Sequence, residues 1–234
     1  MTKNTLKREI KTTLDGSKTL YINDLDEHYH SHNGAIQEAE HVFIKNGLKN
    51  VYDYEINILE MGFGTGLNAL VTINEYLKND KNHVFHYFTF EKYPVNNEEI
   101  VELNYAKHFT FENAQEIYQK IHELEWNKTH EILPNFFFTK YNLDFFKIKE
   151  INLPAINLVY YDCFGAKVQP DLWEKPLFEI VKSKMKEGGL LTTYSSKGSV
   201  RRILKELNFE VTKLEGPKGK REMINAVLKE QSQK

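Results

Sequence analysis

Four acidic residues stand at or just beyond the ends of four apolar runs that have the composition of strands. They are Glu60, Glu91, Asp144 and Asp162. The carboxyl ends of parallel strands meet at one edge of an open sheet, which is where such sheets bind ligands. There, Glu91 could accept hydrogen bonds from both hydroxyls of a ribose, and Asp144 could accept one from an adenine amino group. Each also has a plainer explanation: Glu91 as a solvated strand end, Asp144 as a helix cap, and Asp162 as the anchor of the turn after it.

A glycine-rich loop, Gly62-Phe63-Gly64-Thr65-Gly66, follows Glu60. It lies between a predicted strand and a predicted helix, which is the context that a nucleotide-binding loop requires. Glycines allow a tight turn and let a ligand approach the backbone. The third glycine follows the second by two positions, whereas a dinucleotide-binding fingerprint has three. The spacing therefore favours S-adenosylmethionine or a similar nucleoside over a pyrophosphate, with a turn that binds nothing as the plainer alternative.

Alternating strand and helix patterns predict the framework that would hold these loops. Strands are expected at 56–61, 84–91, 135–140, 156–162, 190–194, 209–214 and 222–228, and helices from 67, over 170–186 with Gly188 and Gly189 as the C-terminal cap, and over 200–207. The predicted fold class is α/β: a Rossmann-like, mostly parallel seven-stranded sheet whose last two strands form an antiparallel hairpin. Residues 1–50 are expected to form an N-terminal extension or lid, and residues 51–234 the Rossmann-like domain, with a helical insertion at 94–134.

Composition and charge exclude several classes of protein. The single cysteine, Cys163, excludes an internal disulfide framework and a thiolate zinc cluster. No apolar stretch reaches the length of a membrane span and the N-terminus lacks an apolar signal core, so a cytoplasmic location without membrane contact is expected. His28, His30 and His32 alternate as on one face of a strand, but no carboxylate with convincing spacing joins them, and no metal is predicted.

Several longer segments resemble a known family. They are residues 60–68, 90–94, 162–173, 193–202 and 219–223, with an upstream stretch at 29–38 and 41–43. In that order they resemble the methyltransferase domain of the bacterial enzyme that makes 5-methylaminomethyl-2-thiouridine in tRNA. The similarity runs from about residue 29 to 226. Family members are often fused to a flavin-dependent oxidase that prepares the amine, and the chain to Lys234 has no room for one. It also has Cys163 where the family usually has glycine.

The resemblance implies an S-adenosylmethionine-dependent N-methyltransferase that converts 5-aminomethyl-(2-thio)uridine to 5-methylaminomethyl-(2-thio)uridine at the wobble position. A separate enzyme would supply the amine, and the tRNA would bind through its anticodon region. Asp162 would be the catalytic aspartate and Glu91 the ribose ligand. The expected cofactor-binding residues are Glu60, Gly62, Phe63, Gly64, Thr65, Gly66, Asn68, Glu91, Lys92, Asp144 and Asp162. The expected substrate-binding residues are Phe164, Trp173, Tyr194, Arg201, Arg202, Lys220 and Arg221.

The chemistry of the implied reaction assigns roles to some of these side chains. An alkylamine is protonated near neutral pH, and Asp162 could bind the ammonium, orient it and help to remove its proton. With an ordinary aspartate pKa of about 4, orientation is the larger contribution. Phe63, Phe164, Trp173 and Tyr194 could wall the cationic centre, with core packing as the alternative.

A basic stretch qualifies the overall formal charge of −2. Residues 197–221 hold eight Lys or Arg against three Glu, which suits docking to a phosphate backbone, although a solvated helix face would look the same. Two other functions stay open. An N-methyltransferase or aminopropyltransferase for small amines would not need the basic stretch. A non-enzymatic RNA-binding module would not need Glu91 and Asp162 at strand ends.

Overall fold

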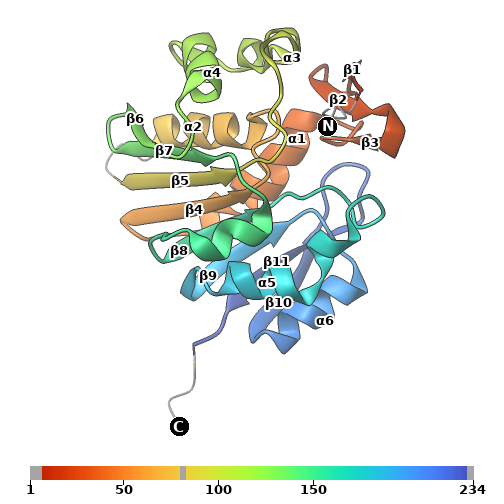
Figure 1. Ribbon diagram of the computed structural model, residues 1–234, viewed down its shortest axis with the longest axis vertical. Coiled ribbons are helices and arrows are strands. Elements are labelled where there is room, and N and C mark those ends of the chain that lie inside the picture. Colours follow the sequence, from red (N-terminus) through yellow and green to blue (C-terminus); the bar gives the residue numbers. More distant parts are fainter. Residues whose placement is uncertain (1–6, 80–82, 231–234) are drawn as a thin grey trace.

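The computed structural model describes residues 7–79 and 83–230, and its centre is an eight-stranded sheet in the order β10-β11-β9-β8-β4-β5-β7-β6 (Figure 1). The strands are β4 Glu55–Met61, β5 Val84–Phe90, β6 Thr129–Leu133, β7 Phe136–Tyr141, β8 Ile156–Tyr161, β9 Met185–Thr193, β10 Phe209–Glu215 and β11 Glu222–Leu228. The strands from β9 through β8, β4 and β5 to β7 are parallel, and β11 is antiparallel to both β9 and β10. The predicted α/β fold, with its mostly parallel sheet and antiparallel C-terminal hairpin, is confirmed.

The prediction of seven strands was one short, because β6 adds an eighth. It pairs antiparallel with β7 at the edge of the sheet, and the two are joined by a turn in which Asn135 has a φ of 60°. Only Ile132 of this strand is buried, so the segment Thr-His-Glu-Ile-Leu shows no apolar run that would predict a strand. The insertion at 94–134 therefore ends in a strand and is not wholly helical.

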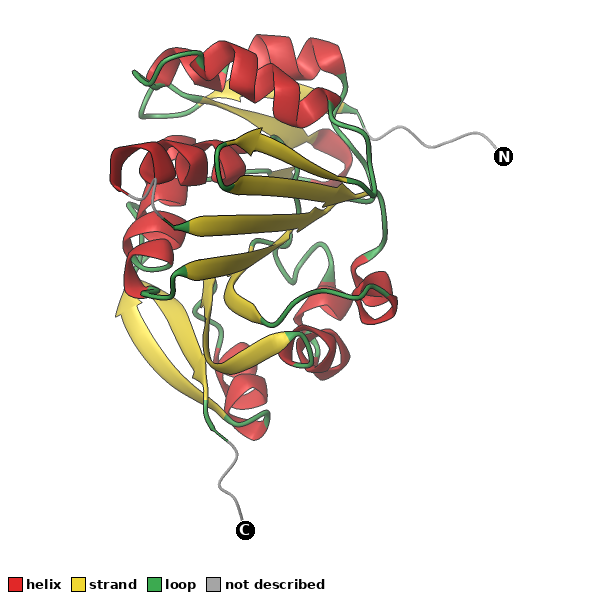
Figure 2. Ribbon diagram, turned by 90° about the vertical axis from the view of Figure 1, so that its left-hand side faces the viewer, coloured by secondary structure: helices red, strands yellow, loops and turns green. Residues whose placement is uncertain are grey.

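Helices cover both faces of the sheet, and each face has its own hydrophobic core (Figure 2). Along β8, Leu158 and Tyr160 face one core while Val159 and Tyr161 face the other, as the alternation of a strand requires. The first core includes residues from helices α1 Ala35–Ala39, α2 Leu67–Asn79 and α4 Ala114–Glu123. The second includes residues from α5 Lys175–Lys182 and α6 Gly198–Glu206. This two-sided burial explains why most residues of β5 and β8 are apolar or aromatic.

The helix expected over 170–186 was predicted too long. A 3-10 helix, Pro170–Trp173, and α5 occupy the first part, and β9 already begins at Met185. Gly188 and Gly189 therefore lie within a strand instead of capping a helix. The register between β8 and β9 shifts between Ile156 and Leu158, opposite this pair, and Gly188 has a φ of 75°. A glycine pair thus marks a strand irregularity here, a signal that resembles a helix cap in the sequence.

The N-terminal segment has two parts. Strands β1 Arg8–Thr12, β2 Lys18–Ile22 and β3 Glu27–His28 form a separate antiparallel sheet beside the carboxyl ends of the main strands (Figure 1). Helix α1 continues into a π-helix, Glu40–Lys45, and these residues pack into the first core through side chains such as Val42 and Phe43. The first hydrophobic core therefore includes residues that precede position 51. Residues 1–6 of the expected extension and 231–234 of the expected domain lie outside the described residues.

The small sheet is tied to the loop that follows β5. The Arg8 guanidinium pairs with Glu99 of helix α3 Asn97–Leu103 at 2.8 Å and hydrogen-bonds to the Tyr29 hydroxyl at 3.2 Å. It also donates to the backbone carbonyls of Tyr93 and Pro94.

Across the described residues, no helix is both long and apolar enough to cross a membrane.

Candidate active site

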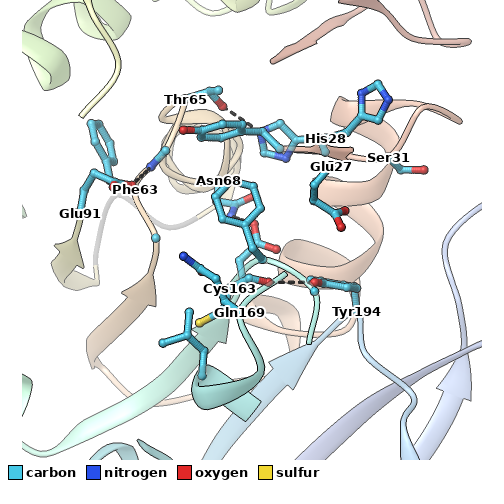
Figure 3. Close-up of a pocket in the computed structure, with 18 of the residues that line it drawn as sticks. Glu27, His28, Ser31, Phe63, Thr65, Asn68, Glu91, Cys163, Gln169 and Tyr194 are labelled. Atoms are coloured by element: carbon cyan, nitrogen blue, oxygen red, sulfur yellow. Dashed lines mark hydrogen bonds between the residues drawn. The ribbon is translucent and has the colours of Figure 1, made fainter. Parts of the chain in front are cut away.

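A cavity of about 350 Å³ opens at the carboxyl ends of β4, β5 and β8, where the N-terminal segment closes over them (Figure 3). A volume of this size suits a small-molecule ligand. The predicted site residues that line it are Gly62, Phe63, Gly64, Thr65, Asn68, Glu91, Lys92, Asp144, Asp162, Phe164, Tyr194 and Lys220. Most of them lie just beyond the carboxyl ends of parallel strands, as the strand-end argument predicted for Glu91, Asp144 and Asp162. Asn68 is in the first turn of α2, and Lys220 is in the turn between β10 and β11.

The three glycines of the loop serve different purposes. Gly62 and Gly64 line the cavity with φ values of 101° and 48°, which glycine adopts without strain. A Cβ on Gly64 would lie 3.2 Å from the Tyr29 ring. Gly66 does not line the cavity; a Cβ there would lie 2.7 Å from His122 Nε2, so this glycine permits close packing against helix α4.

Thr65 joins the loop to two distant segments. Its hydroxyl is 2.8 Å from Nε2 of His30, which belongs to the N-terminal segment. Its carbonyl accepts hydrogen bonds from the Tyr118 hydroxyl at 3.0 Å and from His122 Nε2 at 3.2 Å, both on α4. Burial lowers the pKa of His30 to about 4 and that of His122 to about 3, so both rings are neutral near pH 7. The glycine loop is therefore hydrogen-bonded to the N-terminal segment on one side and to α4 on the other.

Glu91 occupies the end of β5 beside this loop. Its carboxylate accepts hydrogen bonds from the backbone N–H groups of Gly64, at 2.9 Å, and Tyr93, at 2.7 Å. Burial raises its pKa, although these two hydrogen bonds oppose the rise. The carboxylate is thus fixed in place at the cavity wall, with lone pairs left for the hydroxyls of a ribose.

Asp144 is a helix cap, as the plainer explanation proposed, and it also has a place in the cavity wall, so contact with an adenine stays a prediction. It caps the 3-10 helix Phe145–Glu150 by accepting from the Phe146 N–H at 2.9 Å, and it also lines the cavity. Its carboxylate pairs with Lys92 at 2.9 Å. Burial alone would raise its pKa, but hydrogen bonds from Lys92 and Phe146 outweigh burial and lower it.

Asp162 follows β8 at the middle of the cavity. Its Oδ2 accepts a hydrogen bond of 2.8 Å from Asn68 Nδ2, in the first turn of α2. Burial raises the pKa of Asp162 to about 7, while the Asn68 hydrogen bond opposes the rise. A carboxyl group with this pKa exchanges a proton readily near neutral pH.

Glu60 lies beneath the cavity and does not line it. Its side chain is completely buried, and burial raises its pKa well above the ordinary value. Thr89, Tyr87 and Asn68 are its polar neighbours, yet both carboxyl oxygens lack a hydrogen bond of good geometry. This position favours a supporting role for Glu60 over contact with a ligand.

The aromatic residues divide between the cavity and the core. Phe63, Phe164 and Tyr194 line the cavity, and Tyr194 donates a hydrogen bond to the Cys163 carbonyl at 2.8 Å. Trp173 is 5% exposed and outside the lining. Its Nε1 donates to the Phe164 carbonyl at 2.6 Å, so Trp173 positions that backbone from within the core.

Among the four predicted basic substrate residues, Lys220 alone lines the cavity. Its ammonium pairs with Glu38 at 2.6 Å and lies 3.9 Å from the centre of the Tyr194 ring. Arg201 and Arg202 stand in the first turns of α6, which begins shortly after the end of β9. They and Arg221 lie outside the lining.

Sequence patterns missed the contribution of the N-terminal segment. Glu27, Tyr29 and Glu38 line the cavity but carry no local signal, because they meet the glycine loop only in the fold. The resemblance at 29–38, the lid expected from residues 1–50 and the alternating His28, His30 and His32 pointed to this stretch but not to these side chains. Among the described residues no group of three or more His, Cys, Asp or Glu side chains could hold a metal ion.

Comparisons with known proteins agree with this geometry. Residues 110–229, just over half of the chain, match the family model described as S-adenosyl-L-methionine-dependent methyltransferase. The chain is 30% identical over 219 residues to the tRNA 5-methylaminomethyl-2-thiouridine biosynthesis bifunctional protein MnmC of Leptospira interrogans, covering 85% of this chain and 32% of that protein. It is 28% identical over 237 residues to the protein of the same name from Aliivibrio fischeri, covering 93% and 35%. The chain thus spans about a third of the length of these relatives.

A solved structure resembles the fold over nearly its whole length. The crystal structure of MnmC2 from Aquifex aeolicus matches 98% of this chain and 73% of that one, with a TM-score of 0.77 and 26% identity. Two observations therefore agree: the family model matches more than half of the chain, and the cavity has strand-end carboxylates that suit a nucleoside. The chain belongs to the S-adenosyl-L-methionine-dependent methyltransferase family, and S-adenosylmethionine is its cofactor.

Proposed function

We propose that this chain methylates the amine of 5-aminomethyl-(2-thio)uridine at the wobble position of tRNA, forming 5-methylaminomethyl-(2-thio)uridine. The observation that carries the proposal is the carboxyl group of Asp162, with its pKa of about 7, between the glycine loop and a cavity end that is open to a cation. The names of the relatives, which refer to 5-methylaminomethyl-2-thiouridine in tRNA, support the choice of substrate.

The residues of one half of the cavity fit S-adenosylmethionine. Gly62 and Gly64 line the cavity through their backbone alone, and Glu91 presents a fixed carboxylate to a ribose. Asp144 and Phe145 offer a polar acceptor and an aromatic face to an adenine. When bound, the cofactor supplies an activated methyl group on a sulfonium.

Asp162 would take up the proton that the substrate must lose. A free alkylammonium has a pKa of about 10, and removal from water lowers that value. Because the pKa of Asp162 is raised to about 7, the transfer to Asp162 is much less unfavourable than transfer to an ordinary aspartate. Asn68 holds the carboxylate in one orientation, so that the free amine is left aligned for attack on the methyl carbon. The raised pKa strengthens the role of Asp162 as a base beyond what its ordinary value suggests.

Docking of tRNA would use the basic residues of the stretch 197–221. Lys220 lines the cavity, and Arg201, Arg202 and Arg221 belong to the same C-terminal stretch of eight basic residues. Phosphate contacts of this kind position an RNA without reading its sequence. A separate enzyme would provide the aminomethyl group, and a cytoplasmic location would go with a tRNA substrate.

The test is transfer of a labelled methyl group from S-adenosylmethionine to tRNA that carries an unmethylated 5-aminomethyl wobble uridine. Fully modified tRNA is the control. We expect label in the unmethylated tRNA only. If the chain binds the cofactor but labels neither tRNA, the proposal is wrong and small amines become the substrates to try.

A further inference from the structure

The cavity has a second end, opposite Glu91, that the cofactor residues do not use (Figure 3). Figure 3 shows Glu27, His28 and Ser31 on this side and Glu91 on the other, with Asn68 and Cys163 between them. The charged side chains at this end are Glu27, Glu38 and Lys220. Their arrangement determines which charge an incoming group would meet.

Glu38 and Lys220 largely neutralise one another. One carboxylate oxygen of Glu38 accepts from Lys220 Nζ at 2.6 Å, and the other accepts from the Ser31 N–H at 2.7 Å. Lys220 is further held over the Tyr194 ring at 3.9 Å. Because the two charges are paired, together they offer little net attraction to the amine of a substrate.

Glu27 differs from this pair. No described side chain hydrogen-bonds to it or forms an ion pair with it; its electrostatic neighbours are Lys220, Lys167 and Asp26, and its one hydrogen bond is to the backbone of His28. Strand pairing between Glu27 and Ile22 fixes its backbone. Its Oε2 lies 3.6 Å from the position that a Cβ on Gly165 would take, and the Tyr194 hydroxyl lies 4.0 Å from that same position. A Cβ at this position would make ordinary van der Waals contact with both side chains, so the carboxylate of Glu27 lies directly beside the turn after Asp162 and faces the same part of the cavity as Tyr194.

We propose that Glu27 is a specificity-determining residue that binds the positively charged group on the incoming nucleobase and rejects neutral or anionic groups of the same size. This inference rests on the proposed function. A half-buried carboxylate without a side-chain partner attracts a cation and repels an anion. Burial raises the pKa of Glu27, with Lys220 opposing the rise, so gaining a cation would also relieve the cost of keeping this carboxylate charged.

The position of Glu27 gives this selection a place in the reaction. The substrate would arrive as an ammonium, be held by Glu27 at the outer end and then lose its proton to Asp162. The nitrogen lone pair then forms the new N–C bond while the S–C bond breaks, and the bonding pair of that bond stays on sulfur. The product is a secondary ammonium, so the cation that Glu27 recognises is formed again on the product.

The test measures charge selectivity rather than activity alone. Anticodon stem-loop RNAs carry aminomethyl, hydroxymethyl or carboxymethyl at C5 of the wobble uridine, which gives a cation, a neutral near-isostere and an anion. We expect the unaltered chain to bind the aminomethyl RNA most tightly. In Glu27→Gln, the preference for aminomethyl over hydroxymethyl should fall about fivefold, as expected for one partly exposed ion pair. KM for the aminomethyl RNA should rise while kcat changes little.

Asp26→Asn is the matched control. It removes the same charge one residue away, at a side chain that binds the Tyr21 hydroxyl and lies outside the cavity lining. It should leave the selectivity unchanged. Glu27→Lys should make the carboxymethyl RNA the tightest of the three ligands. Equal affinity of all variants for S-adenosylmethionine would show that they are folded.

Two failures can be told apart. If the unaltered chain methylates the aminomethyl RNA and Glu27→Gln keeps the full charge preference, Glu27 does not select the substrate and this inference is overturned. If the unaltered chain neither methylates nor prefers the aminomethyl RNA, the proposed function itself fails.

Discussion

Asp162→Asn should make the protein more stable while it removes activity. The substitution keeps the size of the side chain and leaves an oxygen to accept the hydrogen bond from Asn68. It removes a carboxyl group whose pKa burial raises from 3.8 to about 7. A group with a raised pKa in the folded state stabilises the fold only while it is protonated. Its contribution is fully present below the unfolded pKa of 3.8 and is lost as the pH rises through about 7.

The size of the effect follows from this shift. A rise of about three units at about 1.4 kcal/mol per unit gives about 4 kcal/mol of destabilisation at pH 8. At pH 5 the loss is only about 2 kcal/mol. The loss grows by about 1.4 kcal/mol per pH unit between the unfolded and the folded pKa, and pH 5 is little more than one unit above the unfolded pKa. These are upper limits, since Asp162 keeps some contact with solvent through the cavity. The stabilising effect of Asp162→Asn should therefore grow by about 2 kcal/mol between pH 5 and pH 8.

Urea unfolding at several pH values, without cofactor, measures this difference. Asp144→Asn is the matched control, because its net lowered pKa puts its titration below pH 5 and its effect should be the same at pH 5 and pH 8. Methyl transfer by Asp162→Asn should fall about 100-fold or more, as for loss of a general base. A stability difference that does not change with pH would refute the raised pKa. Full activity would remove Asp162 from the mechanism.

Two further predictions concern the cofactor and the RNA. Glu91→Gln should weaken binding of S-adenosylmethionine about tenfold in a calorimetric titration, because a neutral amide is a poorer acceptor for ribose hydroxyls; unchanged affinity would show that Glu91 holds only the glycine loop. Reversing Arg201 and Arg202 to Glu should weaken tRNA binding and flatten its salt dependence, with cofactor affinity unchanged. Lys78→Glu, at the C-terminal end of α2, should do neither. RNA affinity that survives the Arg201 and Arg202 reversal would exclude docking through α6.

Much of the fold could be predicted because the inner strands are buried on both faces. In runs such as Ile156–Tyr161 every residue but Asn157 is apolar or aromatic, so their pattern is strong. Strand β6 could not be found in this way, because at the sheet edge its pairing with β7 comes from backbone hydrogen bonds and not from an apolar run. Gly188 and Gly189 misled for a related reason: a glycine pair serves a strand irregularity and a helix cap equally well.

The candidate site also has residues that could be predicted from the sequence and residues that could not. Asp162 and Glu91 could be predicted because strand ends in a parallel sheet meet at one edge, whatever the rest of the chain does. Glu27, His30 and Lys220 come to the cavity from the two ends of the chain, and no local pattern specifies where they meet. Burial of Glu60 could not be distinguished from exposure, because the sequence does not say whether a side chain at a strand end points into the cavity or beneath it.

The three hydrogen bonds of Thr65 have a consequence for how the molecule opens. They connect the glycine loop to His30 on one side and to Tyr118 and His122 on the other, so three segments far apart in the chain share one polar junction. Local opening of any one of them loosens the other two, and the three form a single cooperative unit within the larger fold. Substitutions in α4, which does not line the cavity, would then be felt as changes in cofactor affinity, while the sheet stays intact.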